Sequence, residues 1–154
     1  MIIFLDIDGV LVTGRANMPD TKQKGSSAWN PDTKAVEALN YLLSKLDNPS
    51  IVISSTWRLS GLEKMQEFLT EWGVTGKVIS ITPICGLHGL RSHEIHVWLE
   101  DNKYNGDYVV IDDENFDLLT IMPDKFLHVV NGWENGGLTK ELVDNFLFFK
   151  NQEK

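Results

Sequence analysis

Two carboxylates near the start of the chain, Asp6 and Asp8, stand two residues apart directly after an apolar run and are followed by Gly9. Ile2 to Leu5 are aliphatic or aromatic, which is typical of a strand buried on both faces in the middle of a parallel sheet. Open α/β sheets bind ligands at the carboxyl ends of their strands. We therefore expect both acids at a cleft, where Gly9 lets the backbone approach a ligand closely. The alternative is that the acids only form a turn.

Three further segments could bring polar groups to the same cleft. Two are apolar strands that end in polar residues, and the third is a helix that starts with a cation. The residues concerned are Ser54, Ser55, Arg91, Asp112 and Asp113. Because parallel strands end at one edge of their sheet, these side chains are expected beside Asp6 and Asp8.

In this order the segments resemble the four motifs of the haloacid dehalogenase superfamily of phosphotransferases. The motifs are an Asp-x-Asp, a Ser or Thr that ends the second strand, a Lys or Arg before the fourth strand, and an acidic pair after it. They match Asp6-Ile-Asp8-Gly9-Val10, Ser55 with its neighbour Ser54, Arg91, and Asp112-Asp113. The resemblance implies a three-layer αβα Rossmann-like fold, with a central parallel sheet of about five strands and no separate cap domain.

Several short sequence motifs also resemble the phosphatase domain of the Swiss Army Knife RNA repair proteins, which is a more specific resemblance. They include Ser54-Ser-Thr-Trp-Arg58, Arg91-Ser-His-Glu-Ile95 and Gly137-Leu-Thr139. That domain is similar to phosphatases that heal polynucleotide ends. The closer resemblance therefore implies a nucleic acid substrate.

The resemblance assigns roles to the acids. Asp6 would be the nucleophile and a ligand of Mg²⁺, because a carboxylate can approach an anionic phosphate only when a cation neutralises the field between them. Asp8 would offer its backbone carbonyl to the metal and act first as general acid and then as general base. Asp113 would be the remaining metal ligand, and Asp112 would share the ion or orient waters around it.

Ser55 would hydrogen-bond the phosphoryl oxygens, and Arg91 would hold the transferring group in the transition state. Lys77 is the alternative cation, because the family usually has Lys at this position and Arg lacks its compact charge. The other expected substrate contacts are Gly9, Ser54, Thr56 and Arg58. Arg58 would bind a second phosphate, and a surface ion pair is its alternative.

Size and composition limit the remaining possibilities. The chain of 154 residues predicts one domain, 1–154, too small for a sheet domain plus a separate cap. The net charge of -8 argues against tight binding along a duplex but allows brief contact with one strand end. The single cysteine suits a reducing compartment, and no apolar run is long enough to span a membrane. We therefore expect a cytoplasmic protein, with a monomer as the simplest state.

The polar stretch 13–30 is expected to be a flap or loop insertion, because it is too short to form a cap. An open site favours bulky substrates such as a polymer end. Arg15, Lys22 and Lys24 give the flap a positive excess, and Trp29 could stack on a terminal base. The alternative is a solvated loop in which Trp29 covers the edge of the core.

The elements that must position these residues alternate along the chain, as a doubly wound fold requires. The predicted strands are 2–5, 51–55, 77–81, 108–111 and 126–130. The predicted helices begin at Asn30-Pro31-Asp32, near Ser60, near Arg91 and at Thr139.

These observations predict a Mg²⁺-dependent phosphomonoester hydrolase that acts through an aspartyl-phosphate and removes a terminal phosphate, preferably a 3′-phosphate, from nucleic acid in repair. A nucleotidase or another small-molecule phosphatase is the alternative within catalysis. A non-catalytic domain that binds phosphorylated ends or partner proteins is the alternative outside it. Asp8 favours catalysis, because a domain that only binds has no need of an acid-base group.

Overall fold

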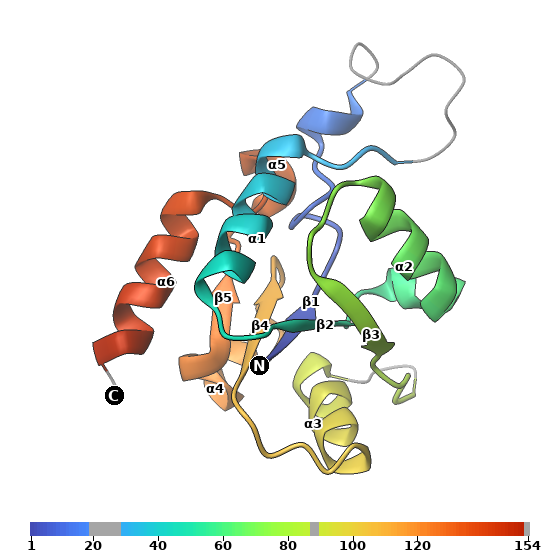
Figure 1. Ribbon diagram of the computed structural model, residues 1–154, viewed down its shortest axis with the longest axis vertical. Coiled ribbons are helices and arrows are strands. Elements are labelled where there is room, and N and C mark those ends of the chain that lie inside the picture. Colours follow the sequence, from blue (N-terminus) through green and yellow to red (C-terminus); the bar gives the residue numbers. More distant parts are fainter. Residues whose placement is uncertain (19–28, 87–89, 153–154) are drawn as a thin grey trace.

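The computed structural model describes residues 1–18, 29–86 and 90–152. A parallel sheet in the order β3-β2-β1-β4-β5 runs through the middle of the molecule (Figure 1). Its strands are β1 (Ile2–Leu5), β2 (Ser50–Ile53), β3 (Lys77–Ile81), β4 (Tyr108–Asp112) and β5 (Phe126–His128). The strand order reverses between β1 and β4, so the carboxyl ends of these two strands form the position where this class of fold binds ligands.

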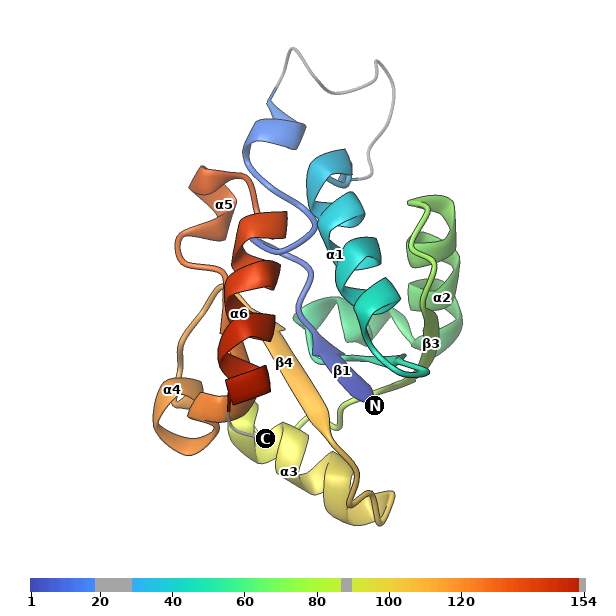
Figure 2. The same ribbon diagram turned by 60° about the vertical axis from the view of Figure 1, so that its left-hand side comes forward.

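Helices cover both faces of the sheet. They are α1 (Thr33–Lys45), α2 (Leu62–Glu71), α3 (Arg91–Asp101), α4 (Leu118–Ile121), α5 (Gly132–Asn135) and α6 (Lys140–Gln152), with short 3-10 helices η1 (Arg15–Asn17), η2 (Thr56–Ser60) and η3 (Pro123–Lys125). The core on one face includes α1, α2 and α6, and the core on the other includes α3 and α4. Figure 2 shows α1 and α6 side by side. This arrangement confirms the predicted three-layer fold.

The central strand β1 is buried on both faces, as its apolar sequence predicts. Ile3 and Leu5 point into the core under α1 and α2, whereas Ile2 and Phe4 point into the core under α3. The Phe4 ring meets the Trp98 ring of α3 edge to face at 5.4 Å. Burying each of these side chains contributes about 1.5–3 kcal/mol. The acids that follow β1 therefore continue from a rigid part of the sheet.

The five predicted strands are confirmed, but β2 ends at Ile53 and β5 at His128, each two residues before the predicted end. Ser55 leaves the sheet to cap η2, where its hydroxyl accepts a hydrogen bond from the backbone N–H of Trp57 at 3.2 Å. A polar residue at a strand end favours such a local bond over continued pairing. This turn decides where the residues after β2 lie.

Two helix starts differ from the predicted ones. Asp32 caps α1 and accepts a hydrogen bond from the backbone N–H of Lys34 at 3.1 Å, so Pro31 stands before the helix and not in its first turn. Gly61, and not Ser60, precedes α2, at a φ of 91°. In the part of the chain that the structure describes, no helix has the length and apolar character needed to cross a membrane.

Candidate active site

The acids of β1 and β4 meet at the carboxyl edge of the sheet. Leu5 pairs with Ile111, and the Asp6 N–H donates to the Ile111 carbonyl at 2.9 Å, which places Asp6 beside Asp112. Asp6, Asp112 and Asp113 each offer a carboxylate oxygen, and these oxygens all lie within 4.8 Å of one another. Asp6 and Asp112 are buried, and Asp113 is half-buried. The structure thus brings three of the predicted site acids into one group, the acid cluster.

Gly9 makes room for the acid cluster. Its φ is 72°, and a Cβ added to it would overlap the carboxyl group of Asp113. Residues other than glycine rarely adopt this backbone conformation. The sequence predicts that Gly9 lets a ligand approach the backbone; in the structure, Asp113 occupies that space.

The surroundings of the acid cluster disfavour the state in which all three of its carboxyl groups are ionised. Burial, followed by the charge of Asp6, raises the pKa of Asp112 to about 8. The same two causes raise the pKa of Asp113 to about 7. Burial also raises the pKa of Asp6, although the guanidinium of Arg91 and a hydrogen bond with Ser55 partly oppose this. Three carboxyl groups this close therefore need more positive charge before all of them ionise at neutral pH.

Arg91, the first residue of α3, is the cation beside the acid cluster. Its Nε lies 3.0 Å from Asp112 Oδ2, and its Nη2 lies 3.8 Å from Asp6 Oδ1. The closer contact is ionic and not a hydrogen bond, since neither Arg91 Nε nor Asp112 Oδ2 has a hydrogen-bond partner among the described residues. The guanidinium also lies over the Phe116 ring, 5.5 Å from its centroid. One buried cation therefore pairs with two of the three carboxyl groups of the acid cluster, those of Asp6 and Asp112.

Lys77 is not an alternative to Arg91. It is the first residue of β3 and pairs with Ser50 at the start of β2, so it lies at the opposite edge of the sheet from the acid cluster. The interpretation of Lys77 as the phosphate cation is wrong, because a parallel strand sends only its carboxyl end to the site.

The acid cluster could hold a metal ion. Its donors are carboxylate oxygens, which hard divalent cations prefer. The buried Asp112 Oδ2 accepts no hydrogen bond from the described residues, and its one printed contact is the ion pair with Arg91, which a metal ion would have to share or replace. Burial, followed by the charge of Asp6, raises the pKa of Asp112 and Asp113, and a bound cation would favour the ionised form of both acids.

Asp8 is exposed, and its side chain is not part of the acid cluster. The indole Nε1–H of Trp57 donates to Asp8 Oδ2 at 3.0 Å. Trp57 belongs to η2, so the segment directly after β2 supplies the group that orients Asp8. The sequence places Trp57 directly after the second motif, but no local pattern reveals that its ring reaches back to Asp8.

A family model described as the HAD domain in Swiss Army Knife RNA repair proteins matches residues 2–143. The chain belongs to this haloacid dehalogenase (HAD) family. The match confirms the closer of the two sequence resemblances and covers every residue of the acid cluster, Asp8 and Arg91. No curated protein and no solved structure gives a significant match.

The serines of the HAD domain lie next to Asp6. Ser55 is buried and hydrogen-bonds Asp6. The Ser54 N–H donates to the Leu5 carbonyl at 3.0 Å, and the buried Ser54 hydroxyl has no hydrogen-bond partner among the described residues. Thr56 follows at the start of η2 and is exposed. These neighbours stand where the second motif of the family is expected.

Arg58 does not face a substrate. Its side chain is 6% exposed, and its Nη1 donates to the carbonyls of Ser54 and Ser55 at 3.0 and 2.9 Å. Its Nη2 bonds Glu94 Oε1 at 2.7 Å. Both predicted roles, a second-phosphate contact and a surface ion pair, are therefore wrong. Arg58 instead connects the turn after β2 to α3 through its hydrogen bonds to the two serine carbonyls and its ion pair with Glu94.

Glu94 links Arg58 to Arg91. It is buried, and its second oxygen lies 3.8 Å from Arg91 Nη1. The neighbours of Glu94 in the sequence, His93, Ile95 and His96, give no local sign that it is buried. Its burial follows from the ion pair with Arg58, which lies 36 positions earlier in the chain. A partner this distant leaves no local signal in the sequence.

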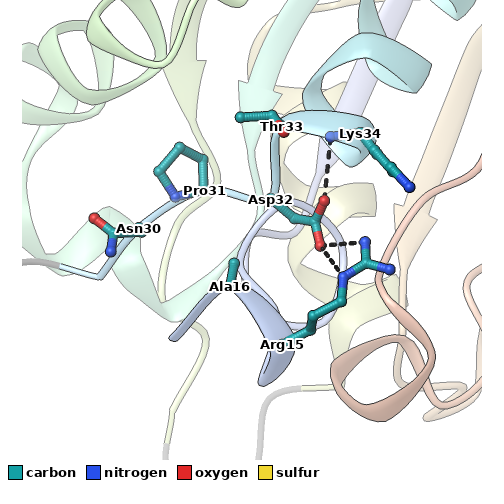
Figure 3. Close-up of a pocket in the computed structure, with 7 residues that line it drawn as sticks. All are labelled: Arg15, Ala16, Asn30, Pro31, Asp32, Thr33 and Lys34. Carbon is teal, nitrogen blue, oxygen red and sulfur yellow. Dashed lines mark hydrogen bonds and ion pairs between the residues drawn. The ribbon is translucent and has the colours of Figure 1, made fainter. Parts of the chain in front are cut away.

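The described start of the flap is tied to α1. Arg15 Nη2 bonds Asp32 Oδ2 at 2.6 Å, and the same oxygen accepts from Thr13 at 3.0 Å. Arg15 and Asp32 line a concavity of about 500 Å³, and no residue of the acid cluster is among its described lining residues. Figure 3 shows the two side chains pointing toward each other. The pairing offsets the charge that Arg15 is expected to supply, while Lys22 and Lys24 lie outside the described residues.

Proposed function

We propose that this HAD domain is a Mg²⁺-dependent phosphomonoester hydrolase that removes a terminal phosphate, preferably a 3′-phosphate, from nucleic acid during RNA repair. The observation that carries the proposal is the separation of two kinds of acid. Asp6 stands in the buried acid cluster, whereas Asp8 is exposed beside it and oriented by Trp57. The family supports phosphatase chemistry in RNA repair.

In this proposal Asp6, Asp112 and Asp113 would hold Mg²⁺, and the backbone carbonyl of Asp8 would be a further oxygen ligand. When bound, the ion offsets the charge of the acids and of the phosphate oxygens, so that an anionic nucleophile and an anionic substrate can approach each other. The donors fit a hard cation because all of them are oxygens.

In the first step, an oxygen of Asp6 forms a bond to phosphorus while the bond from phosphorus to the leaving oxygen of the sugar breaks. The carboxyl group of Asp8 gives its proton to that leaving oxygen. The products are a free hydroxyl end and an aspartyl-phosphate at Asp6.

In the second step, a water oxygen forms a bond to the same phosphorus atom. The Asp8 carboxylate takes the proton from this water, and the bond between phosphorus and Asp6 breaks. Inorganic phosphate leaves and both acids return to their starting states. An exposed Asp8 suits this sequence, because it must meet first the leaving sugar and then water.

Arg91 and Ser55 complete the phosphate site. Arg91 already lies within 3.8 Å of Asp6, so a phosphoryl group attached there would meet its guanidinium. Ser55 hydrogen-bonds Asp6 and could donate instead to a phosphoryl oxygen. Fixed donors aimed at the transferring group stabilise its transition state, and the loss of one commonly lowers the rate by about 100-fold to 1,000-fold.

An open site supports a polymer end as the substrate. In the part of the chain that the structure describes, the elements are the strands of the sheet and the helices around it, and the proposal therefore includes no cap over the acid cluster. The net charge of -8 fits brief contact with one strand end.

A cytoplasmic site of action is part of the proposal and rests on the single cysteine, Cys85.

The test is turnover of a 3′-phosphorylated oligoribonucleotide, its 5′-phosphorylated isomer and free mononucleotides, with and without Mg²⁺. We expect Mg²⁺-dependent release of phosphate from the 3′-phosphorylated strand and none from the Asp6→Asn variant. Asp47→Asn, an exposed acid on the loop after α1, is the control and should keep full activity. Turnover of mononucleotides alone would indicate a nucleotidase, and binding without turnover would indicate a non-catalytic domain.

The role of Asp8 can be tested through Trp57. The Trp57→Phe variant keeps an aromatic ring but removes the N–H that orients Asp8. We expect a decrease in kcat of roughly tenfold for a sugar leaving group, which needs protonation. A nitrophenyl phosphate ester, whose leaving group needs little protonation, should react almost as fast as with the parent. Equal losses on both substrates would show that Trp57 acts only on stability.

A further inference from the structure

An aromatic slot opens beside Asp8. It is a cavity of about 290 Å³ lined by Trp29, Trp57, Ser60, Phe68, Glu71 and Trp72. Phe68 and Trp72 of the α2 region stack with an angle of 13° between their planes, and Trp57 meets both rings edge to face at centroid distances of 5.8 and 5.6 Å. The volume is at the lower end of pockets that hold small molecules, which start at about 300 Å³.

Trp57 connects the slot to the proposed chemistry. Its ring forms one wall of the slot, while its N–H holds Asp8 at 3.0 Å. Asp8 is the group that would protonate the leaving oxygen. A leaving nucleoside whose oxygen meets Asp8 would therefore have its remaining parts next to the slot.

The charge of the lining indicates what the slot can hold. Glu71 is acidic, and none of the described residues that line the slot is basic. A second phosphate would meet a carboxylate with no cation to balance it, which is unfavourable. A neutral flat ring fits better, because every base presents a π-face that stacks on aromatic side chains without regard to sequence.

Trp29 gives the slot an accessible wall. The residue is 47% exposed, and its ring meets the Trp133 ring edge to face at 5.8 Å. The exposed part of this apolar side chain can contact a ligand. Trp29 is thus oriented by another tryptophan and still accessible to a ligand.

We propose that this aromatic slot binds the base of the terminal nucleotide, the one that carries the phosphate to be removed. The proposal rests on the proposed function and deepens it, since it makes the leaving nucleoside, and not only the phosphate, a recognised part of the substrate. The slot is built from aromatic faces and lacks a dense set of polar groups. It therefore accepts different bases and rejects ends that have no base.

The experiment compares two oligoribonucleotides that differ only at the 3′-phosphorylated end, where one carries a base and the other an abasic sugar. Base stacking on aromatic side chains changes affinity by about fivefold to 150-fold. We expect the parent to show at least a fivefold higher KM for the abasic end. Trp29→Ala should raise the KM of the base-bearing end by a similar factor and leave the abasic end unchanged.

Two further variants separate stacking from folding. Trp29→Phe keeps a ring and should restore most of the affinity that Trp29→Ala loses. Phe149→Ala removes an aromatic side chain on α6 that is 66% exposed and outside the slot, and it should change neither KM. Equal KM values for both ends with the parent, or equal losses on both ends with Trp29→Ala, would overturn the proposal.

The two proposals fail in different ways. If the parent hydrolyses neither end, the phosphatase proposal fails, and the slot is then tested by fluorescence anisotropy with labelled unphosphorylated strands. Tighter binding of the base-bearing strand, lost in Trp29→Ala, would support the slot without catalysis. If the parent hydrolyses both ends with one KM, the slot proposal fails and the phosphatase proposal stands.

Discussion

The two ends of β4 carry the same kind of residue in opposite surroundings. At the amino end, Asp107 is bound by Lys125 Nζ at 2.7 Å and by Lys150 Nζ at 2.9 Å. At the carboxyl end, Asp112 and Asp113 face Asp6, and Arg91 is the cation that pairs with Asp112 and Asp6. Burial alone would raise the pKa of Asp107, but the hydrogen bonds from the two lysines outweigh it and lower the pKa to about 2.

The contrast separates stability from function within one strand. An acid with two lysines is stabilised in its charged form, so it helps the folded state at neutral pH. Buried acids that lie close together are unfavourable in their ionised forms, and the ion pairs among the described residues do not remove this cost. Proteins tolerate such a conflict at sites where a ligand resolves it, and it is therefore a marker of a functional site.

The largest expected effect comes from removing a negative charge at the carboxyl end of β4. Asp113→Asn removes one donor of the acid cluster, so we expect a loss of activity of at least about 100-fold, since even groups behind metal ligands commonly contribute 10-fold to 100-fold. Without metal, the same variant should melt at a higher temperature than the parent at pH 8, because a repelling charge is gone. Steady-state kinetics and thermal melts check both parts, and a lower melting temperature at this pH would contradict the contrast.

The second prediction concerns the space that Asp113 occupies. In Gly9→Ala the new methyl group would overlap the Asp113 carboxyl group, so the acid cluster must shift. Displacing a reacting group by about 1 Å can decrease a rate by roughly 100-fold. We expect a loss of 10-fold to about 100-fold in kcat/KM.

Gly73→Ala is the matched control for Gly9→Ala. Gly73 has a φ of 82°, close to the 72° of Gly9, but a Cβ there would meet no atom within 4 Å. It should lower the free energy of unfolding by about 1 kcal/mol from backbone strain alone and leave activity intact. Similar activity losses in the two variants would show that strain, and not the position of Asp113, controls the site.

The third prediction is that the two ends of β4 affect stability in different pH ranges. The pKa values of Asp112 and Asp113 rise from 3.8 to about 8 and about 7, so the folded metal-free protein keeps protons that the unfolded chain has released. Their contribution to stability therefore falls as pH rises from about 4 to about 8. Asp107 acts with the opposite sign: its pKa of about 2 gives stability that is present above pH 4 and is lost as pH falls from about 4 to about 2.

Chemical unfolding from pH 2 to pH 9 tests these ranges. Without metal, stability should rise between pH 2 and 4 and decline between pH 4 and 8. Added Mg²⁺ should remove most of the decline, because it binds the ionised acids of the folded state. A metal-free profile that is flat between pH 4 and 8 would contradict the charge conflict at the carboxyl end.

The smallest effect is expected at the amino end. Asp107→Asn weakens two ion pairs, but the Asp107 side chain is 35% exposed, so solvent screens both. We expect the free energy of unfolding to fall by about 1 kcal/mol, the upper value for pairs near the surface. Activity should stay at the parent level, and a large loss of activity would show that the two ends of β4 are not separate in function.

The fold could be predicted almost completely from local patterns. The apolar run Ile2 to Leu5 matches β1, and the range 77–81 matches β3 without change. The end of a strand was harder to predict where its last residues can form a local hydrogen bond in place of strand pairing, and very short helices were also harder to predict. Ser55 prefers to cap η2, so β2 stops at Ile53, and the four-residue helix Leu118–Ile121 gives no periodic signal.

The candidate site could be predicted in part. The positions of Asp6, Asp112 and Asp113 follow from strand polarity, and the structure brings them within 4.8 Å. The functions of Arg58 and Glu94 could not be predicted, because both depend on a buried ion pair between distant segments. The hydrogen bond from Trp57 to Asp8 spans 49 positions and likewise leaves no local pattern.

By itself, the sequence determined which residues stand at the carboxyl ends of the strands, because apolar runs specify strands and parallel strands share one direction. Only the tertiary structure decided what each charge faces. Asp107 directly precedes β4 and Asp112 ends it, yet Lys125 and Lys150 reach the first acid while Asp6 and Arg91 lie beside the second. The state of a charge depends on burial and on neighbours brought together by folding, and these are properties of the packed chain.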